Sequence, residues 1–367
     1  NTETSGRYHT DWLNMMYPRL RLARNLLTDD GIIVMSIDDY EFYNLKKIAD
    51  EVFGENNFVG TIITRCNPQG RGRKNIDPVH EYNFIYAKNI SYMGELTIKR
   101  DEGEMTTNYL LRSGTNSRKF ERPLRFYPLL VKDGKVSCIT QYEYEQIYDG
   151  ERFNEQHLAY LEKKYTSLGF QYVLPIAKNG EEKVWQREFN RVRNECHTYI
   201  YESGQIKTPA LLYRTPQSLW LNEKYSNSGS GTNILISLFD GLKPFDFPKS
   251  YKTVQDFITL NDDKNMIVMD FFAGSSTTAH AVMDLNAKDG GNRKFIMVQL
   301  PESLENTYNN ADKDRKKELR KVIDFLIENN KPATLAEIGK ERIRRAGEKI
   351  KEENKDKENI ENLDIGF

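Results

Sequence analysis

The chain has 367 residues, 38% of them hydrophobic and 29% charged, and its formal net charge is −1. This composition is typical of a folded chain of two or three domains and excludes wholesale disorder, while the charge balance gives no global attraction for a polyanion. Three cysteines without a CxxC pair, five scattered histidines and the lack of any apolar run of about 20 residues argue against a disulfide framework, a metal centre and a membrane span.

The first 88 residues alternate helical and strand patterns. In Asp11–Leu27, apolar residues recur every three or four positions, as on one helix face, although Pro18 predicts a kink or a later helix start. The next expected elements are a strand at Gly31–Ile37, a helix at Tyr40–Phe53, and strands at Phe58–Thr64 and Tyr82–Ala87. Strands separated by helices predict a mostly parallel sheet.

Residues 89–233 show a different pattern, with short mixed segments rich in Tyr, Asn, Gly and Arg. A helix is expected within Leu158–Leu168 and a strand within Gln205–Tyr213. The segment Gly60–Leu130 contains twelve Lys or Arg and seven Asp or Glu, which gives it a net charge of +5. A basic stretch interleaved with Tyr and Phe suits the DNA backbone, but from the residues alone, solvated surface charge explains it equally well.

The most informative segment is a strand, a glycine turn, a helix and a second strand in succession. Ile267–Asp270 is an apolar run typical of a buried strand, Gly274 permits a tight turn, a helical pattern follows at Ser275–Leu285, and Lys294–Leu300 is the second strand. This order predicts a nucleotide-type pocket at the carboxyl end of the first strand. The turn lacks the lysine of a P-loop, which argues against a nucleoside triphosphate, and it lacks the three spaced glycines of an NAD or FAD site. S-adenosylmethionine, a nucleoside without phosphates, is therefore the better candidate ligand.

The sequence DFFAGSSTTAHAV, from Asp270, resembles motif I of the amino-directed DNA methyltransferases, and its surroundings resemble the modification subunits of type III restriction-modification systems. Other similar segments are SGRYHTDWLNMMYPRLRLARNLLTDDGIIVMSIDD, HEYNFIYAK, NYLLRSGTNSRKFERPLRFYPL, FDFPKS and GKERIRRAGEKI, so the resemblance covers nearly the whole chain. It implies an α/β, Rossmann-like S-adenosylmethionine-dependent methyltransferase fold with a mostly parallel sheet and an inserted α+β target-recognition domain. The implied domains are residues 1–88, the first part of the methyltransferase domain; 89–233, the target-recognition insert; 234–330, the cofactor-binding part; and 331–367, a charged helix or linker.

The catalytic tetrapeptide of that family, Asp-Pro-Pro-Tyr, lies upstream of the segment that resembles Asn1–Asp39, and neither DPPY nor NPPY occurs in this chain. Its Asp and a backbone carbonyl orient the weakly nucleophilic amine of a flipped base toward the methyl donor. We therefore expect a chain truncated at its N-terminus and also at its C-terminus, with cofactor and DNA contacts but no turnover by itself. No catalytic residue is assigned.

The resemblance implies that three stretches bind the cofactor: the turn, the end of the following strand and the FDFPKS segment. The residues are Asp270, Phe271, Phe272, Ala273, Gly274, Ser275, Thr277, Gln299, Glu302, Phe247, Pro248 and Lys249. Simpler roles exist for some of them, since Asp270 is also a charge partner for the helix N-terminus and the FDFPKS segment is also an ordinary turn. Ser276 stands where motif I commonly has glycine, and Gln299 where related chains often have Glu.

Two further groups are assigned to DNA. Ser36, Asp38 and Asp39, at a strand end, are placed near the target base, although a plain helix cap explains them nearly as well. The residues expected to reach DNA phosphates are Arg71, Arg73, Lys74, Arg118, Lys119, Arg122 and Arg125. Trp185 and Trp220 are more simply explained by buried packing than by base stacking.

The resulting hypothesis is most of a type III modification subunit, which methylates adenine N6 with S-adenosylmethionine. The expected partners are double-stranded DNA, a second copy in a homodimer and a helicase-nuclease restriction subunit, in the cytoplasm and away from membranes. Two alternatives stay open: a DNA-binding specificity module without catalysis, and a methyltransferase for cytosine N4.

Overall fold

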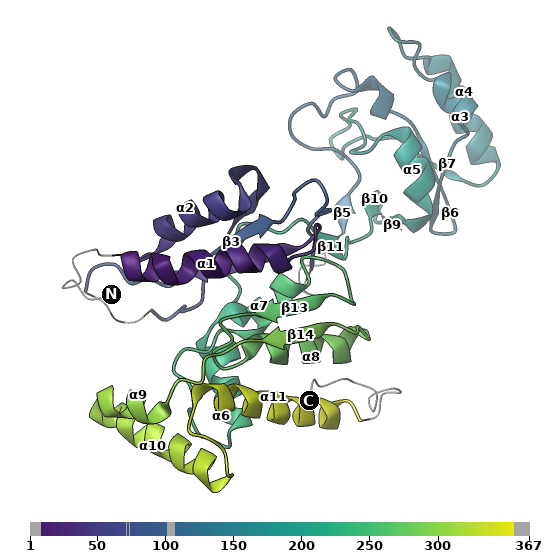
Figure 1. The fold of residues 1–367 in the computed structure, drawn as a ribbon. Helices are drawn as coiled ribbons and strands as arrows, with labels where there is room; N and C mark the ends of the chain where they lie inside the picture. Colours follow the sequence, from purple (N-terminus) through teal and green to yellow (C-terminus); the bar gives the residue numbers. More distant parts are fainter. Residues whose placement is uncertain (1–8, 71, 73, 101–106, 356–367) are drawn as a thin grey trace. The chain divides into compact units, whose positions relative to one another are not determined.

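The computed structural model describes residues 9–70, 72, 74–100 and 107–355. The chain divides into two compact units: the first combines Asn1–Ile98 with Thr215–Phe367, and the second is Lys99–Arg214 (Figure 1). These boundaries fall inside the 89–233 range that composition marked as an insert. Two short strands, β4 (Ile98–Lys99) and β11 (Tyr213–Arg214), lie at the boundaries.

The N-terminal part of the first unit is a four-stranded sheet with two helices. Its elements are α1 (Thr10–Leu26), β1 (Ile32–Ile37), α2 (Phe42–Phe53), β2 (Phe58–Thr64), β3 (Glu81–Ala87) and β12 (Leu219–Trp220). Most of these bounds follow the predicted ones within two residues, and α1 continues through Pro18. The helices and the sheet share a core that includes Leu20, Leu45, Phe53 and Phe84.

The prediction of a mostly parallel sheet is wrong. The strand order is β1-β3-β2-β12, in which β3 runs antiparallel to both β1 and β2, while β2 and β12 run parallel. The physical reason is that the described residues between β2 and β3 include no helix, and a chain that returns through a loop pairs antiparallel. The large sheet of the second unit is antiparallel throughout.

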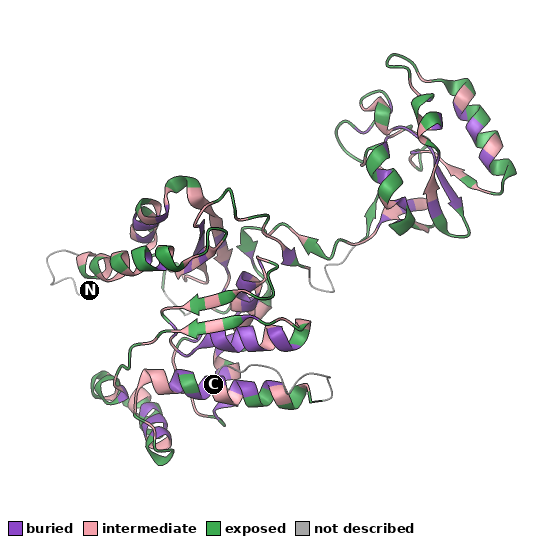
Figure 2. Cartoon of the chain, turned by 45° about the vertical axis from the view of Figure 1, so that its right-hand side comes forward, coloured by how far each residue is buried: buried purple, intermediate pink, exposed green. Residues whose placement is uncertain are grey.

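The rest of the first unit surrounds a two-stranded parallel sheet, β13 (Ile267–Asp270) and β14 (Lys294–Met297). Its helices are α6 (Asn233–Leu238), α7 (Tyr251–Ile258), α8 (Thr277–Asp289), α9 (Leu304–Asn310), α10 (Lys313–Glu328) and α11 (Leu335–Glu353). Helix α8 is mostly buried, since it packs against β14, α7 and α11 (Figure 2).

Strand β13 forms as predicted, but the expectation that it is a buried strand is wrong for one of its faces. Ile267 is 65% exposed and Met269 39% exposed, and Ile296 of β14 is 47% exposed. The alternate residue Val268 packs on the α8 side. Because successive side chains point to opposite faces, the helices cover one face of this sheet and leave the other accessible in the described residues.

The second unit is a six-stranded antiparallel sheet in the order β5-β10-β9-β7-β6-β8. Its elements are β5 (Asn108–Tyr109), β6 (Leu129–Lys132), β7 (Lys135–Cys138), α3 (Gln141–Glu145), α4 (Glu155–Ser167), β8 (Gln171–Val173), α5 (Phe189–Glu195), β9 (Ile200–Glu202) and β10 (Gln205–Thr208). The predicted helix at Leu158–Leu168 corresponds to α4, and the predicted strand at Gln205–Tyr213 to β10 and the start of β11.

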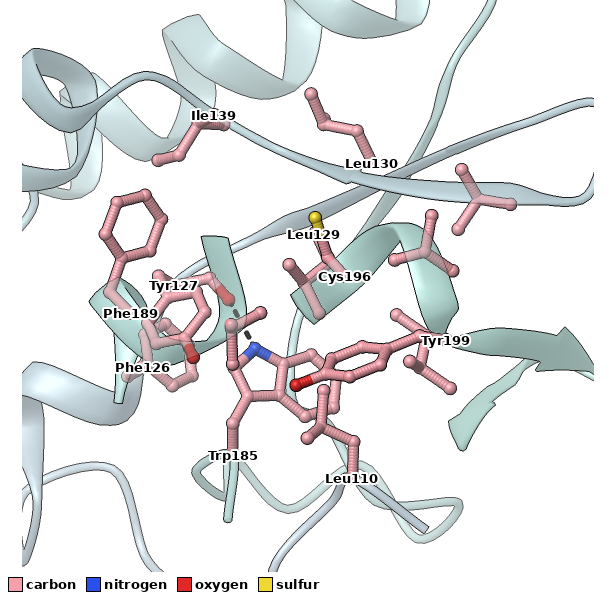
Figure 3. Close-up of a cluster of buried hydrophobic side chains, with 14 of the residues drawn as sticks. Leu110, Phe126, Tyr127, Leu129, Leu130, Ile139, Trp185, Phe189, Cys196 and Tyr199 are labelled. Carbon is pink, nitrogen blue, oxygen red and sulfur yellow. Dashed lines mark hydrogen bonds between the residues drawn. The ribbon is translucent and has the colours of Figure 1, made fainter. Parts of the chain in front are cut away.

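Both tryptophans considered for base stacking are buried. Trp185 is 2% exposed in the core of the second unit, where its indole Nε1 donates to the carbonyl of Tyr127 at 2.7 Å (Figure 3). Trp220 is 4% exposed and stacks between Tyr225 and Phe257. The packing explanation is therefore confirmed.

Candidate cofactor loop and DNA-contact residues

The turn between β13 and α8, residues 271–276, is here called the cofactor loop. It is a sharp bend that needs two residues with left-handed backbone, Gly274 with φ +52° and Ser276 with φ +59°. Glycine adopts this conformation without strain, and a serine rarely does. Position 276 thus requires a backbone conformation that glycine adopts more easily than serine.

The side chain of Asp270 fixes the start of the cofactor loop. Its Oδ1 accepts the backbone N–H of Phe272 at 3.1 Å, and its Oδ2 accepts the hydroxyl of Thr278 at 2.7 Å. One carboxylate therefore joins the end of β13, the loop and the first turn of α8. This arrangement agrees with a role in shaping the loop and also with a charge partner for the helix N-terminus.

The segment that follows β14 holds the middle of the loop. The backbone N–H of Gly274 donates to Oε1 of Gln299 at 2.7 Å, while the Gln299 Nε2 donates to the carbonyl of Leu300 at 3.3 Å. The carbonyl of Val298 accepts from the N–H of Ala273. Glu302, the other acid considered for the ribose, lies just beyond and is exposed.

The aromatic residues of this region divide between core and surface. Phe271 packs against the core of the β1–β3 sheet, whereas Phe272 is 50% exposed and Phe247 77% exposed. Pro248 is buried, and the ammonium of Lys249 forms an ion pair with Glu81 at the start of β3. The structure thus brings the FDFPKS segment into contact with the sheet that carries the predicted base-pocket residues.

Ser275 and Thr277 face a partner that was not predicted from the sequence. Arg342 of α11 is 0% exposed, and its Nη1 donates to the hydroxyls of Ser275 at 2.9 Å and Thr277 at 2.7 Å. Its Nη2 lies 3.5 Å from Nδ1 of His280. Burial lowers the pKa of Arg342 to about 9, and burial together with Arg342 holds the pKa of His280 well below its usual value, so the imidazole is neutral and accepts.

Gly339 lies one turn before Arg342 on α11 and touches the same loop. A Cβ at this position would stand 2.6 Å from the hydroxyl oxygen of Ser276 and 3.4 Å from the carbonyl oxygen of Gly274. The only sequence signal for both residues was the GKERIRRAGEKI segment, which was assigned to a charged helix.

The predicted base-pocket residues lie at the end of β1 and in the following turn. The hydroxyl of Ser36 donates to Oδ1 of the buried Asn83 at 2.7 Å. Asp38 accepts the backbone N–H of Tyr40 at 3.1 Å, and Asp39 is exposed. Burial and the Asp39 carboxylate raise the pKa of Tyr82 on β3.

The predicted phosphate contacts have different surroundings. Arg71 and Arg73 lie outside the described residues, and Lys74 is exposed. In the second unit, the side chain of Lys119 is only 5% exposed, and its ammonium pairs with Glu155 and Glu182 and lies over two phenylalanine rings. These contacts anchor Lys119 within its own unit.

The three arginines beside Lys119 are more accessible. Arg118 has a side chain 70% exposed and pairs with Glu181, and Arg122 is partly exposed. The side chain of Arg125 is 20% exposed. Its guanidinium pairs with the carboxylate of Glu188 and donates to the carbonyl of Gln186. Accessibility thus ranks Arg118 first among these three guanidiniums.

The described residues include no candidate metal centre, because no group of three or more His, Cys, Asp or Glu among them is arranged to hold a metal ion. The three cysteines, all of them among the described residues, form no disulfide. No helix in that part of the chain has the length and apolar character that crossing a bilayer requires.

Comparison with known proteins gives a consistent picture. The chain is 32% identical over 333 residues to the type III restriction-modification enzyme EcoPI Mod subunit of Escherichia phage P1, a match that covers 84% of the chain and 48% of that protein. It is 33% identical over 342 residues to the StyLTI Mod subunit of Salmonella typhimurium, covering 90% and 48%. The chain therefore spans about half the length of these relatives.

A type II enzyme and a solved structure are also similar. The type II methyltransferase M.KpnI of Klebsiella pneumoniae is 32% identical over 318 residues, covering 82% of the chain and 69% of that protein. The crystal structure of a candidate DNA modification methylase from Thermus thermophilus matches with 11% identity and a TM-score of 0.34, over 81% of the chain and 76% of that structure. The model of the N6/N4 methyltransferase family, described as DNA methylase, matches residues 2–310. The chain therefore belongs to the N6/N4 DNA methylase family.

Proposed function

We propose that this chain supplies the cofactor-binding and DNA-recognition parts of a DNA methyltransferase that transfers a methyl group from S-adenosylmethionine to adenine N6 in a type III restriction-modification system. The observation that carries the proposal is the cofactor loop, in which Gln299, two residues beyond β14, accepts the N–H of Gly274. The loop joins a β-strand to a helix within a chain of the DNA methylase family. On this proposal, the sheets of the first unit belong to a Rossmann-like methyltransferase domain.

The residues around the loop suit S-adenosylmethionine chemically. Phe272 and Phe247 offer exposed aromatic surface for an adenine ring, and the exposed carboxylate of Glu302 suits hydroxyl donors of a ribose. We assign Asp270 and Gln299 to holding the loop, since their side-chain oxygens already accept backbone N–H groups. S-adenosylmethionine supplies an electrophilic methyl group on its sulfonium.

The target base and the DNA are assigned to separate residues. Ser36, Asp38 and Asp39 are proposed for the base pocket, while exposed cations, including Lys74 and Arg118, contact phosphates. Lys119 holds its surrounding segment in place, because its ammonium is already paired. We propose adenine rather than cytosine as the target base, because the chain resembles the modification subunits of type III systems.

The proposed partners follow from the relatives and from the resemblance. We propose double-stranded DNA, a restriction subunit of the helicase-nuclease class and a second copy of the modification subunit, in the cytoplasm. We further propose that the chain binds the cofactor without turnover by itself, because no DPPY or NPPY occurs in it. A DNA-binding module without catalysis is the second candidate function, and the missing tetrapeptide is the observation that favours it.

Calorimetry with S-adenosylmethionine separates these candidates. The wild-type chain should bind with one site per chain, and Gly274→Asp should abolish binding while the chain stays folded. Gly290→Asp is the matched control, because Gly290 also has a left-handed backbone, φ +67°, and lies at the opposite end of α8. A wild-type chain that binds DNA but not the cofactor would support the binding module instead. For any methylated product, mass spectrometry of the nucleosides distinguishes 6-methyladenine from 4-methylcytosine.

A further inference from the structure

Arg342 is an unusual buried charge. In the described part of the chain, the partners of its guanidinium are the hydroxyls of Ser275 and Thr277, the carbonyl of Ser275 and the imidazole of His280, with no carboxylate among them. Its Nε has no hydrogen-bond partner in that part of the chain. Burying a cation without a carboxylate partner costs free energy. If residue 342 served only to fill space, an apolar side chain would make the fold more stable.

The contacts of this cation lie at the junction between the cofactor loop and α8. Ser275 belongs to the cofactor loop, Thr277 begins α8, and both hydroxyls accept from the same nitrogen, Nη1. The guanidinium therefore joins the loop to the first residue of the helix. Ser276, between these two residues, has the left-handed backbone. Its side chain makes no capping hydrogen bond to α8, a bond that commonly fixes the start of a helix.

Gly339 adds a steric contact from the same helix. The hydroxyl of Ser276 occupies the space that a side chain at position 339 would take. Helix α11 thus approaches the strained part of the loop with a residue that has no side chain, and it places the Arg342 guanidinium beside Ser275 and Thr277.

We propose that Gly339 and Arg342 of α11 hold the cofactor loop in its ligand-binding conformation, with Arg342 as a positioning residue for S-adenosylmethionine. This inference rests on the proposed function, since it takes the loop to be the cofactor site. Arg342 lies behind the loop and acts through Ser275 and Thr277. It raises cofactor affinity because the loop is already ordered before the ligand arrives.

The first experiment compares Arg342→Met with Arg342→Lys. Hydrogen exchange of the cofactor-free chain reports on the amides of residues 271–277, and calorimetry gives the dissociation constant for S-adenosylmethionine. Arg342→Met should speed loop exchange and weaken binding by about tenfold or more, whereas Arg342→Lys, which keeps a cationic donor, should recover part of both.

Arg345→Met is the matched control for losing an arginine from α11. Arg345 contacts the carbonyl of Leu238 and the carboxylates of Asp240 and Glu341, and none of these belongs to the loop. It should lower the melting temperature and leave both loop exchange and affinity within about twofold of the wild type. A folded Arg342→Met chain with unchanged loop exchange and unchanged affinity would overturn the proposal.

The second experiment stays informative if Arg342→Met does not fold. Gly339→Ala favours the helix by about 1 kcal/mol in intrinsic propensity, so helix loss does not explain a weaker site. It should nevertheless weaken cofactor binding, because its methyl group displaces the Ser276 hydroxyl. Adding Ser276→Gly removes that hydroxyl and suits the left-handed backbone, so the double variant should regain affinity. Equal affinities in Gly339→Ala and the wild type, or no recovery in the double variant, would contradict the proposal.

The outcomes also separate this inference from the proposed function. If the wild-type chain does not bind S-adenosylmethionine but Arg342→Met still speeds loop exchange, the cofactor assignment fails while the positioning contact stands. If the wild type binds and every α11 variant binds equally well, the cofactor assignment stands and the positioning role is wrong.

Discussion

The backbone N–H of Gly274 donates to the side-chain oxygen of Gln299 at 2.7 Å, which joins the bend after β13 to the segment after β14. An acceptor at position 299 is therefore part of the loop structure. A glutamate at this position would also provide an acceptor oxygen, whereas an apolar residue would not. The identity of residue 299 should consequently control cofactor affinity.

Gln299→Leu should weaken S-adenosylmethionine binding about three- to tenfold, because the Gly274 N–H loses its acceptor and the loop its anchor. Gln299→Glu is the control, since it keeps an acceptor oxygen and should bind within about threefold of the wild type. Calorimetry on both variants checks this expectation. Equal affinities for Gln299→Leu and the wild type would show that the hydrogen bond does not matter to the site.

Phe272→Ala should reduce cofactor affinity by about tenfold through the loss of an aromatic surface for the adenine ring. Phe272 is 50% exposed, so the variant should melt at nearly the wild-type temperature. Phe271→Ala provides the contrast, because Phe271 packs against the neighbouring core and its loss should lower the melting temperature. A Phe272→Ala chain that binds like the wild type would remove this residue from the site.

At acidic pH, protonation of Glu341 on α11 should destabilise the fold. Burial raises the pKa of this carboxyl, but contacts with Lys331, Arg345 and Arg344 outweigh burial and lower it from 4.5 to about 2. The ionised carboxylate therefore stabilises the fold above pH 4.5, and that contribution is lost as the pH falls toward 2.

Glu341→Gln should accordingly lower the free energy of unfolding by about 1 to 3 kcal/mol near neutral pH, and the difference from the wild type should shrink as the pH falls from about 4.5 to about 2. Urea denaturation at several pH values measures it, with the exposed Glu348→Gln as the control. A difference that stays constant across this range would mean that the carboxylate charge is not responsible.

The basic residues of the second unit should separate into two classes. Arg118→Gln should weaken binding to double-stranded DNA and reduce the slope of affinity against salt by about 0.9 for each phosphate that the variant no longer neutralises. Lys119→Met should instead destabilise the chain by about 1 to 3 kcal/mol, because the Lys119 ammonium pairs with Glu155 and Glu182. Fluorescence anisotropy at several salt concentrations, together with urea denaturation, tests both. A Lys119→Met chain of normal stability and reduced salt slope would reverse the assignment.

Local patterns were sufficient to predict most elements near the site. The apolar run at Ile267–Asp270 and the strand at Phe58–Thr64 have the predicted bounds, because strand formation there follows the residues themselves. The predicted direction of β3 was wrong, because the alternation of helices and strands does not show which strands pair with each other. Partial exposure of β13 was missed for a similar reason, as a short apolar run has the same sequence whether one or both faces are covered.

Side-chain partners were the least predictable part. Arg342 lies 65 residues from Thr277 along the chain, and the charged pattern of its helix gives no sign that one cation is buried. Lys119 similarly lies among surface-type arginines in sequence, yet its ammonium is enclosed by Phe126 and Phe153. Such contacts depend on how helices and loops pack in three dimensions, and no local periodicity records that.

Photochemical cross-linking of radiolabelled S-adenosylmethionine, followed by peptide mapping, tests the central claim most directly. We predict that the label is found in peptides containing residues 271–277 or the exposed Phe247, and that excess unlabelled cofactor competes it away. Saturable labelling confined to other parts of the chain, or no competable labelling at all, would contradict the assignment of this loop as the cofactor site.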